Sequence, residues 1–315
     1  MKILITGGLG YVGSALIPRL ITVFPKAQLI VLDNLSTGKR ETLPTSFRGN
    51  FIPADIREFD FKTLGLSRKD FVVHLAALSN PGESFERPEE YEEINLQGTL
   101  RTAEACVKTG AAFFFPSTTS VYHQTGGKWI HGCDQFLKPQ TPYAGYKLKA
   151  EKKIAAIKKL RYAIVRFATI YGNAPGITYQ TAVNKFCWQA SMGQPLSLYK
   201  TALNQYRPYL FVEDAAKLIA RLIKTKRFFR ETFHAASDQA AVKDVVEIIR
   251  PWAAGMKIIK INSPAMNALS YRVSSECLKP LGIQMEGSLR EGIRQLLKRR
   301  GPVALPKKAG ISCKV

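Results

Sequence analysis

Lys2-Ile-Leu-Ile-Thr-Gly-Gly-Leu-Gly-Tyr-Val-Gly13 joins a short apolar run to a turn with glycines at positions 7, 10 and 13. Lys2–Thr6 predicts a buried strand, and the spacing of apolar residues over Tyr11–Thr22 predicts a helix. In such a strand–turn–helix, Gly7 permits the tight turn, Gly10 lets the backbone approach a pyrophosphate, and Gly13 allows close helix–strand packing. The helix N-terminus then offers its free amides to the phosphates.

Asp33 ends a second predicted strand, Gln28–Leu32, twenty residues after Gly13. A carboxylate in this place accepts hydrogen bonds from the hydroxyls of an adenosine ribose, so the turn and Asp33 together predict a dinucleotide site. The same carboxylate would repel a 2′-phosphate, which favours NAD over NADP as the cofactor. Lys39 and Arg40 follow closely and weaken this preference.

Short apolar strands alternate with helical stretches through residues 1–170, and the strands are apolar along their whole length. This alternation predicts an α/β fold of the Rossmann type, a doubly wound parallel sheet with a smaller C-terminal α/β lobe. We expect an NAD-binding domain over 1–170, a substrate-binding lobe over 171–297 that is interleaved with it, and a basic, disordered tail over 298–315. Further strands are expected near Phe51–Pro53 and over Phe71–Leu75, Ala112–Pro116 and Ala163–Phe167, with helices over Pro88–Lys108 and Pro142–Lys159.

Tyr143 and Lys147 lie four residues apart in Thr-Pro-Tyr-Ala-Gly-Tyr-Lys, about one helical turn, so their side chains share a face of the expected helix. A phenol has an ordinary pKa of about 10, and an ammonium group within about 4–6 Å favours the phenolate. The pair can therefore act as a general acid and base beside the dinucleotide.

These features resemble the extended short-chain dehydrogenase/reductases that act on nucleotide sugars, in particular enzymes like UDP-glucose 4-epimerase. The resemblance spans residues 2–297, and the order of its motifs is more specific than any one of them. Besides the glycine turn and Tyr143-x-x-x-Lys147, the motifs are Asp33-Asn34-Leu35-Ser36, Ala54-Asp55-Ile56-Arg57, His74-Leu75-Ala76-Ala77, Ile94-Asn95 to Thr99, Pro116-Ser117-Thr118 to Tyr122, Arg166 to Gly172 and Arg207 to Asp214.

The resemblance implies the cofactor contacts and the assembly. Asp55 and Ile56 would contact adenine, and Leu75, Ala76 and Ala77 would run beneath the cofactor. Tyr11, Val12, Asn34 and Asn95 complete the implied cofactor contacts, together with Gly7, Gly10, Asp33, Tyr143 and Lys147. A homodimer built from the helices near residues 90–108 and 143–159 is also implied.

The resemblance also implies the chemistry. Tyr143 would take a proton from a sugar hydroxyl while hydride moves to the nicotinamide, Lys147 would hold the ribose and depress the pKa of the tyrosine, and Thr118 would be its hydroxyl partner. Arg207 would bind the diphosphate of a nucleotide sugar, because a guanidinium pairs with phosphate in a bidentate way. Thr118, Thr169, Asn184 and Arg207 are the implied substrate contacts, whereas Tyr271 replaces a common arginine.

The residues before Val121-Tyr122 reduce the number of reaction types that we expect. Related dehydratases and decarboxylases use an acidic residue there, and this chain has Thr119 and Ser120 instead. We therefore expect a nucleotide-sugar 4-epimerase that oxidises C4 transiently and returns the hydride. The alternative is an NAD(P)H-dependent reductase of 4-keto-sugar nucleotides. A third interpretation is a catalytically silent relative that binds nucleic acid or membrane through its basic surface.

The composition is that of an ordinary soluble protein except for its charge: 46% of residues are hydrophobic, and 46 Lys+Arg against 24 Asp+Glu give +22. We expect a cytoplasmic enzyme without a nucleic-acid partner, although the basic tail could make a weak contact with an anionic membrane. Five dispersed cysteines lack metal-ligand spacing, so no metal is expected. His123, His131 and Cys133 are candidate extra acids or bases, with solvent-exposed loop histidines as the alternative.

Overall fold

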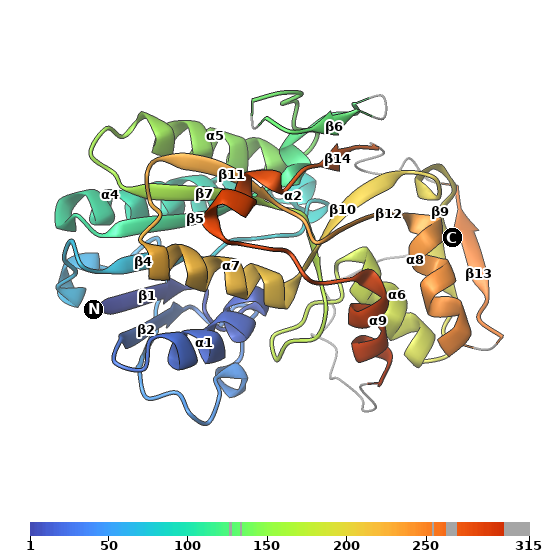
Figure 1. Ribbon diagram of the computed structural model, residues 1–315, viewed down its shortest axis with the longest axis horizontal. Helices are drawn as coiled ribbons and strands as arrows, with labels where there is room; N and C mark the ends of the chain where they lie inside the picture. The colour runs from blue at the N-terminus through green and yellow to red at the C-terminus, as the bar shows by residue number, and fades with distance from the viewer. Residues whose placement is uncertain (126–127, 133, 254, 263–269, 299–315) are drawn as a thin grey trace.

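The computed structural model describes all residues except 126–127, 133, 254, 263–269 and 299–315 (Figure 1). Its central feature is a seven-stranded sheet with the order β11-β7-β5-β4-β1-β2-β3, in which every pair of neighbours is parallel. The chain order reverses between β1 and β4, the place where open sheets of this kind bind ligands. The strands are β1 (Lys2–Thr6), β2 (Gln28–Asp33), β3 (Asn50–Pro53), β4 (Phe71–His74), β5 (Ala112–Thr118), β7 (Tyr162–Phe167) and β11 (Glu231–Ala235).

Helices cover both faces of this sheet (Figure 1). On one face lie α1 (Tyr11–Val23) and α7 (Val212–Thr225), and on the other α4 (Thr99–Thr109) and α5 (Pro142–Ala156). β5 shows why its strand is apolar throughout: Phe114 packs with the first pair of helices, Phe113 and Phe115 pack with the second, and all three are fully buried. The predicted doubly wound α/β fold is thus confirmed.

A smaller lobe follows the large sheet and has its own apolar core. It contains a three-stranded sheet of β8 (Thr169–Tyr171), β10 (Tyr206–Phe211) and β12 (Asp238–Ala241), and the pair β9 (Leu196–Tyr199) and β13 (Ile258–Ile261). Its helices are α6 (Ala182–Ser191), α8 (Val242–Ile249) and α9 (Leu289–Lys298). The two lobes interleave, because α7 and β11 lie in the large sheet layer although they follow β8 in the chain. The lobe boundary at residue 171 stays a prediction, and the tail beyond Lys298 lies outside the described residues.

Two predicted helices differ from the structure. The segment expected as a helix over Pro88–Lys108 is helical throughout, but a π-helical turn (Glu93–Gly98) separates α3 (Pro88–Glu92) from α4. Asn95 in this turn hydrogen-bonds the backbone of Leu78. The expected helix to Lys159 ends at Ala156, where Arg230 takes over the last carbonyls by donating to the oxygens of residues 155, 157, 158 and 160.

Within the described part of the chain, no helix is long and apolar enough to cross a membrane. The same part holds no cluster of three or more His, Cys, Asp or Glu side chains arranged to bind a metal ion. Cys106, Cys187 and Cys277 are free thiols.

Candidate active site

The glycine turn has the geometry that a dinucleotide pyrophosphate requires. Gly7 has a φ of +64°, and a Cβ there would lie 2.5 Å from the amide nitrogen of Ala76. Gly10 caps α1 without a side-chain hydrogen bond, and the first turn of α1 carries no acidic residue. The first amides of α1, from Tyr11 and Val12 onward, are therefore oriented toward an anion, and the turn fits NAD.

Asp33 is fixed beside this turn. Its Oδ2 accepts from the amide of Leu9 at 3.1 Å, its Oδ1 accepts from the amide of Leu35 at 2.9 Å, and only 7% of the residue is exposed. Each carboxyl oxygen keeps a further lone pair for a ribose hydroxyl. A dianionic 2′-phosphate would meet a buried negative charge here, so the site favours NAD.

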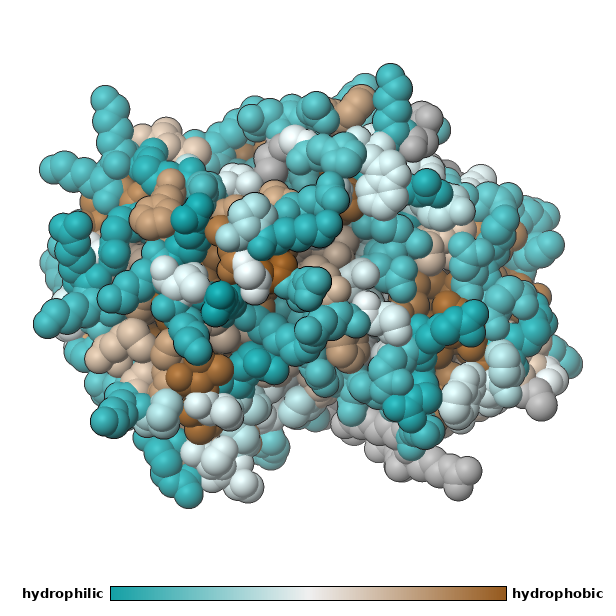
Figure 2. Space-filling model, in the orientation of Figure 1, coloured by the Kyte–Doolittle hydropathy of each residue, from teal (hydrophilic) through white to brown (hydrophobic). Residues whose placement is uncertain are grey.

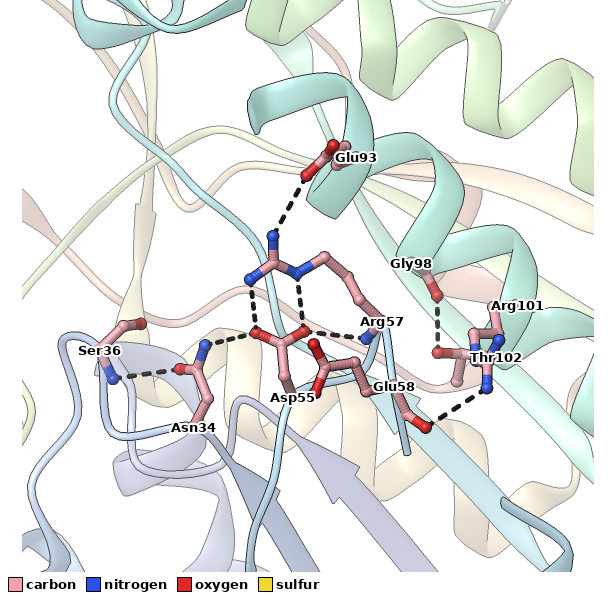
Figure 3. Close-up of polar contacts among 9 residues, drawn as sticks. All are labelled: Asn34, Ser36, Asp55, Arg57, Glu58, Glu93, Gly98, Arg101 and Thr102. Atoms are coloured by element: carbon pink, nitrogen blue, oxygen red, sulfur yellow. Dashed lines mark hydrogen bonds and ion pairs between the residues drawn. The ribbon is translucent and has the colours of Figure 1, made fainter. Parts of the chain in front are cut away.

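A pocket at the end of β3 continues the site, lined by Asn34, Pro53, Ala54, Asp55, Glu58 and Phe59. Figure 3 shows Asp55 between two donors: Asn34 Nδ2 at 2.9 Å, and Arg57, whose Nε and Nη2 both lie at 3.0 Å. Arg57 also reaches Glu93 at 3.2 Å. The hydrogen bonds from Arg57, foremost, and from Asn34 lower the pKa of Asp55 to about 2. Ile56 lies buried beneath, against Gly98.

The segment after β4 is held in place by two polar side chains. Thr6 supports it from β1, with its carbonyl accepting from the amide of Leu75 at 2.9 Å and its Oγ1 accepting from Ala76 at 3.4 Å. Asn95, fully buried, accepts from the amide of Leu78 at 2.9 Å and donates to its carbonyl at 2.8 Å. Asn95 therefore fixes the backbone of the segment that follows Ala77, and the family resemblance implies that Leu75 to Ala77 run beneath the cofactor.

Tyr143 is the second residue of α5. Thr141 caps α5 by accepting from the amide of Ala144 at 3.2 Å, and the amide of Tyr143 donates to Ser84 Oγ at 3.1 Å. The side chain is half-buried and hydrogen-bonded to Thr118, the predicted partner. Burial raises the pKa of Tyr143 to about 12, and the hydrogen bond with Thr118 opposes this rise. The structure thus brings together Thr118 and Tyr143 at the carboxyl edge of the sheet.

Lys147 lies one turn further and is 3% exposed. Its Nζ donates to the carbonyl of Pro116 at 3.1 Å and lies 4.7 Å above the ring of Phe115. Burial lowers the pKa of Lys147 to about 8, and the Glu151 carboxylate opposes this. The sequence predicts that Lys147 depresses the pKa of Tyr143, whereas in this structure burial dominates both groups.

The buried ammonium predicts a pH dependence of folding. The pKa of Lys147 is about 8 in the folded chain and 10.5 when unperturbed, so between these values the unfolded chain binds more protons. Stability from this residue therefore rises as pH increases from about 8 to about 10. We expect urea unfolding to show this rise in the wild-type protein relative to Lys147→Met, which cannot titrate. Parallel pH profiles of the two proteins would contradict it.

The smaller lobe places Arg207 near the carboxyl edge of the large sheet. Arg207 lies in β10, 5.6 Å above the ring of Tyr271, and the hydroxyl of Tyr271 lies 3.2 Å from Thr119 Oγ1. The tyrosine that replaces a common arginine therefore joins the substrate lobe to the residue after Thr118. The neighbouring Arg272 packs 3.8 Å above the ring of Tyr206. Thr169, half-buried in β8, pairs with Tyr209 of β10.

Asn184 links the two lobes at the glycine turn. Its fully buried amide accepts from the amide of Gly172 at 3.2 Å and donates to the Tyr11 hydroxyl and the Thr178 carbonyl, each at 3.0 Å. Tyr11 in turn donates to the carbonyl of Gly172. A substrate contact by Asn184 stays a prediction; the structure adds that its amide holds the loop after β8 against α1.

We expect Tyr11→Phe to weaken this link. The change leaves the Gly172 carbonyl and one Asn184 donor without a partner, which costs about 1–3 kcal/mol of unfolding free energy. Chemical denaturation measures the loss. The matched control is Tyr199→Phe, since Tyr199 is 43% exposed. Equal, negligible effects of both changes would contradict the role of Tyr11.

A buried polar chain behind Lys147 is the main feature that the sequence does not reveal. Arg166 donates to Glu151 at 3.0 and 3.1 Å and to the Tyr122 hydroxyl at 2.6 Å, and this hydroxyl contacts His234 Nε2. His234 Nδ1 lies 3.2 Å from the carbonyl of Ser274. Burial, foremost, lowers the pKa of His234 to about 4, so the ring is neutral, and Tyr122 can donate to it. Glu151 follows Lys147 by four residues, and this spacing on one helix could have indicated a polar partner for Lys147.

The three other histidines differ in their burial. His74 is fully buried between Thr6 and Thr99, at 2.9 and 3.0 Å, and burial lowers its pKa to about 3. His123 is half-buried and His131 is exposed. Cys133 lies outside the described residues, and a catalytic role for these three stays a prediction.

Comparison with known proteins finds relatives of one family. Residues 3–234 match the model of the NAD dependent epimerase/dehydratase family. The chain is 26% identical to a putative UDP-glucose 4-epimerase of Methanocaldococcus jannaschii, over 94% of this chain and 97% of the relative. It is 25% identical to the human dTDP-D-glucose 4,6-dehydratase, over 94% and 89%. The UDP-glucose 4-epimerase of Thermotoga maritima, solved with UDP-glucose, has the same fold, with a TM-score of 0.84, 23% identity and 94% and 97% coverage.

Proposed function

The chain belongs to the NAD dependent epimerase/dehydratase family, and we propose that within it the chain is a nucleotide-sugar 4-epimerase with Tyr143 as acid and base. Membership makes it an NAD-dependent enzyme, and the family includes epimerases and dehydratases; the reductase of 4-keto-sugar nucleotides is the alternative. The observation that favours epimerisation over dehydration is the pair Thr119 and Ser120, which stands where elimination needs a carboxyl group.

The surroundings of Thr119 support this choice. Thr119 is 2% exposed, and its hydroxyl lies 3.2 Å from the Tyr271 hydroxyl. The Ser120 amide donates to Thr118 Oγ1 at 3.1 Å and so turns the backbone away from the strand. A hydroxyl cannot act as the base that removes a proton next to a keto group at neutral pH. One proton carrier, Tyr143, is sufficient for epimerisation.

The residues of this chain then have distinct tasks. NAD, held by the glycine turn and Asp33, would supply reversible hydride transfer at C4 of the sugar. Tyr143 takes the proton of the 4-hydroxyl and later returns it, while Thr118 donates a hydrogen bond to the same oxygen region. Lys147 supplies positive charge one helical turn away.

Substrate binding is assigned to the second lobe. Arg207, steadied by the ring of Tyr271, would pair with the diphosphate, and Thr169 would face the sugar. The homodimer through the helices near residues 90–108 and 143–159 and the cytoplasmic location stay predictions.

The test is a screen of nucleotide sugars with the purified full chain, with products and bound cofactor identified by mass. A 4-epimerase should carry NAD from purification and convert one nucleotide hexose into its C4 epimer without consuming cofactor. Stoichiometric loss of NADH or NADPH with a 4-keto-sugar nucleotide would instead support the reductase and overturn the proposal.

A further inference from the structure

The edge of the central sheet opposite the candidate active site is strongly basic. All seven strands are parallel, so their amino ends meet at one edge and the glycine turn, Thr118 and Tyr143 lie at the other. The linkers that lead into β2, β3, β4, β5, β7 and β11 are residues 24–27, 43–49, 65–70, 110–111, 157–161 and 226–230. They contain one acidic residue, Asp70, and these cations: Lys26, Arg48, Arg68, Lys69, Lys158, Lys159, Arg161, Lys226, Arg227 and Arg230.

Hydrogen bonds join four neighbouring linkers, those that lead into β4, β5, β7 and β11. Arg161 Nη2 donates to the carbonyl of Arg68 at 2.7 Å and to that of Gly110 at 3.0 Å, which joins the entries of β7, β4 and β5. Arg230 donates to the carbonyl of Lys158 at 2.9 Å and thus joins the entry of β11 to that of β7. Six interstrand spacings of about 4.8 Å make the whole edge about 29 Å long.

Carboxylates do little to neutralise this edge. Asp70 is 4% exposed and turned inward, accepting from the amide of Lys2 at 2.6 Å and from Ser67 Oγ at 2.9 Å. Arg227 forms an ion pair with Glu231 at 3.5 Å. No other linker cation forms an ion pair with a described residue. Burial and then the charge of Arg68 lower the pKa of Arg161, as expected where cations crowd together.

An exposed aromatic residue lies within the basic edge. Phe229 is 62% exposed, and the guanidinium of Arg227 lies 5.0 Å from its ring. The edge is at the left of Figure 1, where the chain begins, and in the same view Figure 2 shows mostly hydrophilic side chains protruding there, with scattered apolar ones between them. Cations around a single exposed aromatic ring suit the boundary between lipid head groups and acyl chains.

We propose that this amino edge, defined by the linker cations above with Lys108 and Phe229, binds the surface of an anionic lipid bilayer. Lysine and arginine side chains attract anionic head groups without specific geometry, and Phe229 would enter the interface. A single-stranded nucleic acid would need several stacking platforms, and among the described linker residues Phe229 is the one exposed aromatic side chain. Docking by this edge leaves the candidate active site facing the solvent.

Vesicle flotation of the full chain tests the proposal, with phosphatidylcholine vesicles compared with mixed phosphatidylcholine and phosphatidylglycerol vesicles. The variant Lys69→Glu/Lys108→Glu/Lys159→Glu reverses three exposed charges on the edge. The matched control, Lys243→Glu/Lys257→Glu/Lys260→Glu, makes the same change in net charge on the second lobe. Phe229→Ser tests the apolar contact separately.

We expect the wild type to float with the anionic vesicles, less so at high salt, and not with phosphatidylcholine alone. The edge variant should lose affinity on the order of a hundredfold, and the control variant far less. Phe229→Ser should weaken vesicle binding more at high salt than at low salt, because salt screens the charges and leaves the apolar contact. Absence of binding to anionic vesicles, or equal losses in edge and control variants, would overturn the proposal. Binding of a single-stranded RNA in place of vesicles, lost in the edge variant, would assign the edge to nucleic acid and also overturn it.

Discussion

Tyr143→Phe is expected to reduce turnover by about 100- to 10,000-fold, because it removes the proposed proton carrier and leaves the ring in place. The amount of NAD that copurifies should stay nearly unchanged, since the phenol is not part of the glycine turn or of the Asp33 region. Steady-state rates and the absorbance of extracted NAD measure both quantities. The control is Tyr146→Phe on the same helix, which should stay within about twofold of wild-type turnover. Wild-type turnover in Tyr143→Phe would place the proton carrier elsewhere.

A change at Thr118 tests the pKa of Tyr143 separately from the presence of its hydroxyl. Thr118→Val keeps the shape of the side chain and removes the hydroxyl that opposes the rise in the pKa of Tyr143. In Thr118→Val the rise of the rate with pH should therefore occur at higher pH than in the wild type. In Tyr143→Phe this rise should be absent, because the phenol is gone. An unchanged pH profile in Thr118→Val would show that this hydroxyl does not act on the phenol.

Arg166→Met is expected to have the largest effect on stability, about 3–5 kcal/mol of unfolding free energy. The change leaves the Glu151 carboxylate, 4% exposed, without the guanidinium that it accepts from at 3.0 and 3.1 Å. The Tyr122 hydroxyl also loses its donor at 2.6 Å. Urea or thermal unfolding measures the loss.

Two controls make this result specific. Arg294→Met breaks an exposed pair with Glu291 and should change stability much less. The double change Arg166→Met/Glu151→Leu removes both buried charges and should recover part of the loss. If the single and double variants were equally unstable, lost packing of the arginine, and not an uncompensated carboxylate, would account for the effect.

The features that sequence predicts well are local. The glycine turn, Asp33, and the pair Tyr143 and Lys147 each depend on residues a few positions apart, and the structure places all of them at the carboxyl edge of the sheet. The parallel sheet follows from strands that are apolar on both faces, as Phe113, Phe114 and Phe115 illustrate.

The features that sequence misses depend on contacts between distant segments. The Asn184 amide meets Tyr11 across 173 positions, and Tyr122 meets His234 across 112. Arg230 binds the carbonyl of Ile157 at the end of α5 from 73 positions away. The residues near Ala156 do not predict that the helix ends there. The pKa of Lys147 likewise depends on burial, which spacing alone does not give.

The central claim, C4 epimerisation with Tyr143 as the proton carrier, is tested most directly with the nucleotide hexose that the screen identifies, deuterated at C4. An enzyme that removes and returns the same hydride should yield the C4 epimer with the deuterium still at C4, at undiminished NAD content. Tyr143→Phe should give almost no product. Deuterium found at C6 would indicate dehydration, and deuterium released into free NADH would indicate net oxidation; either result would contradict the account.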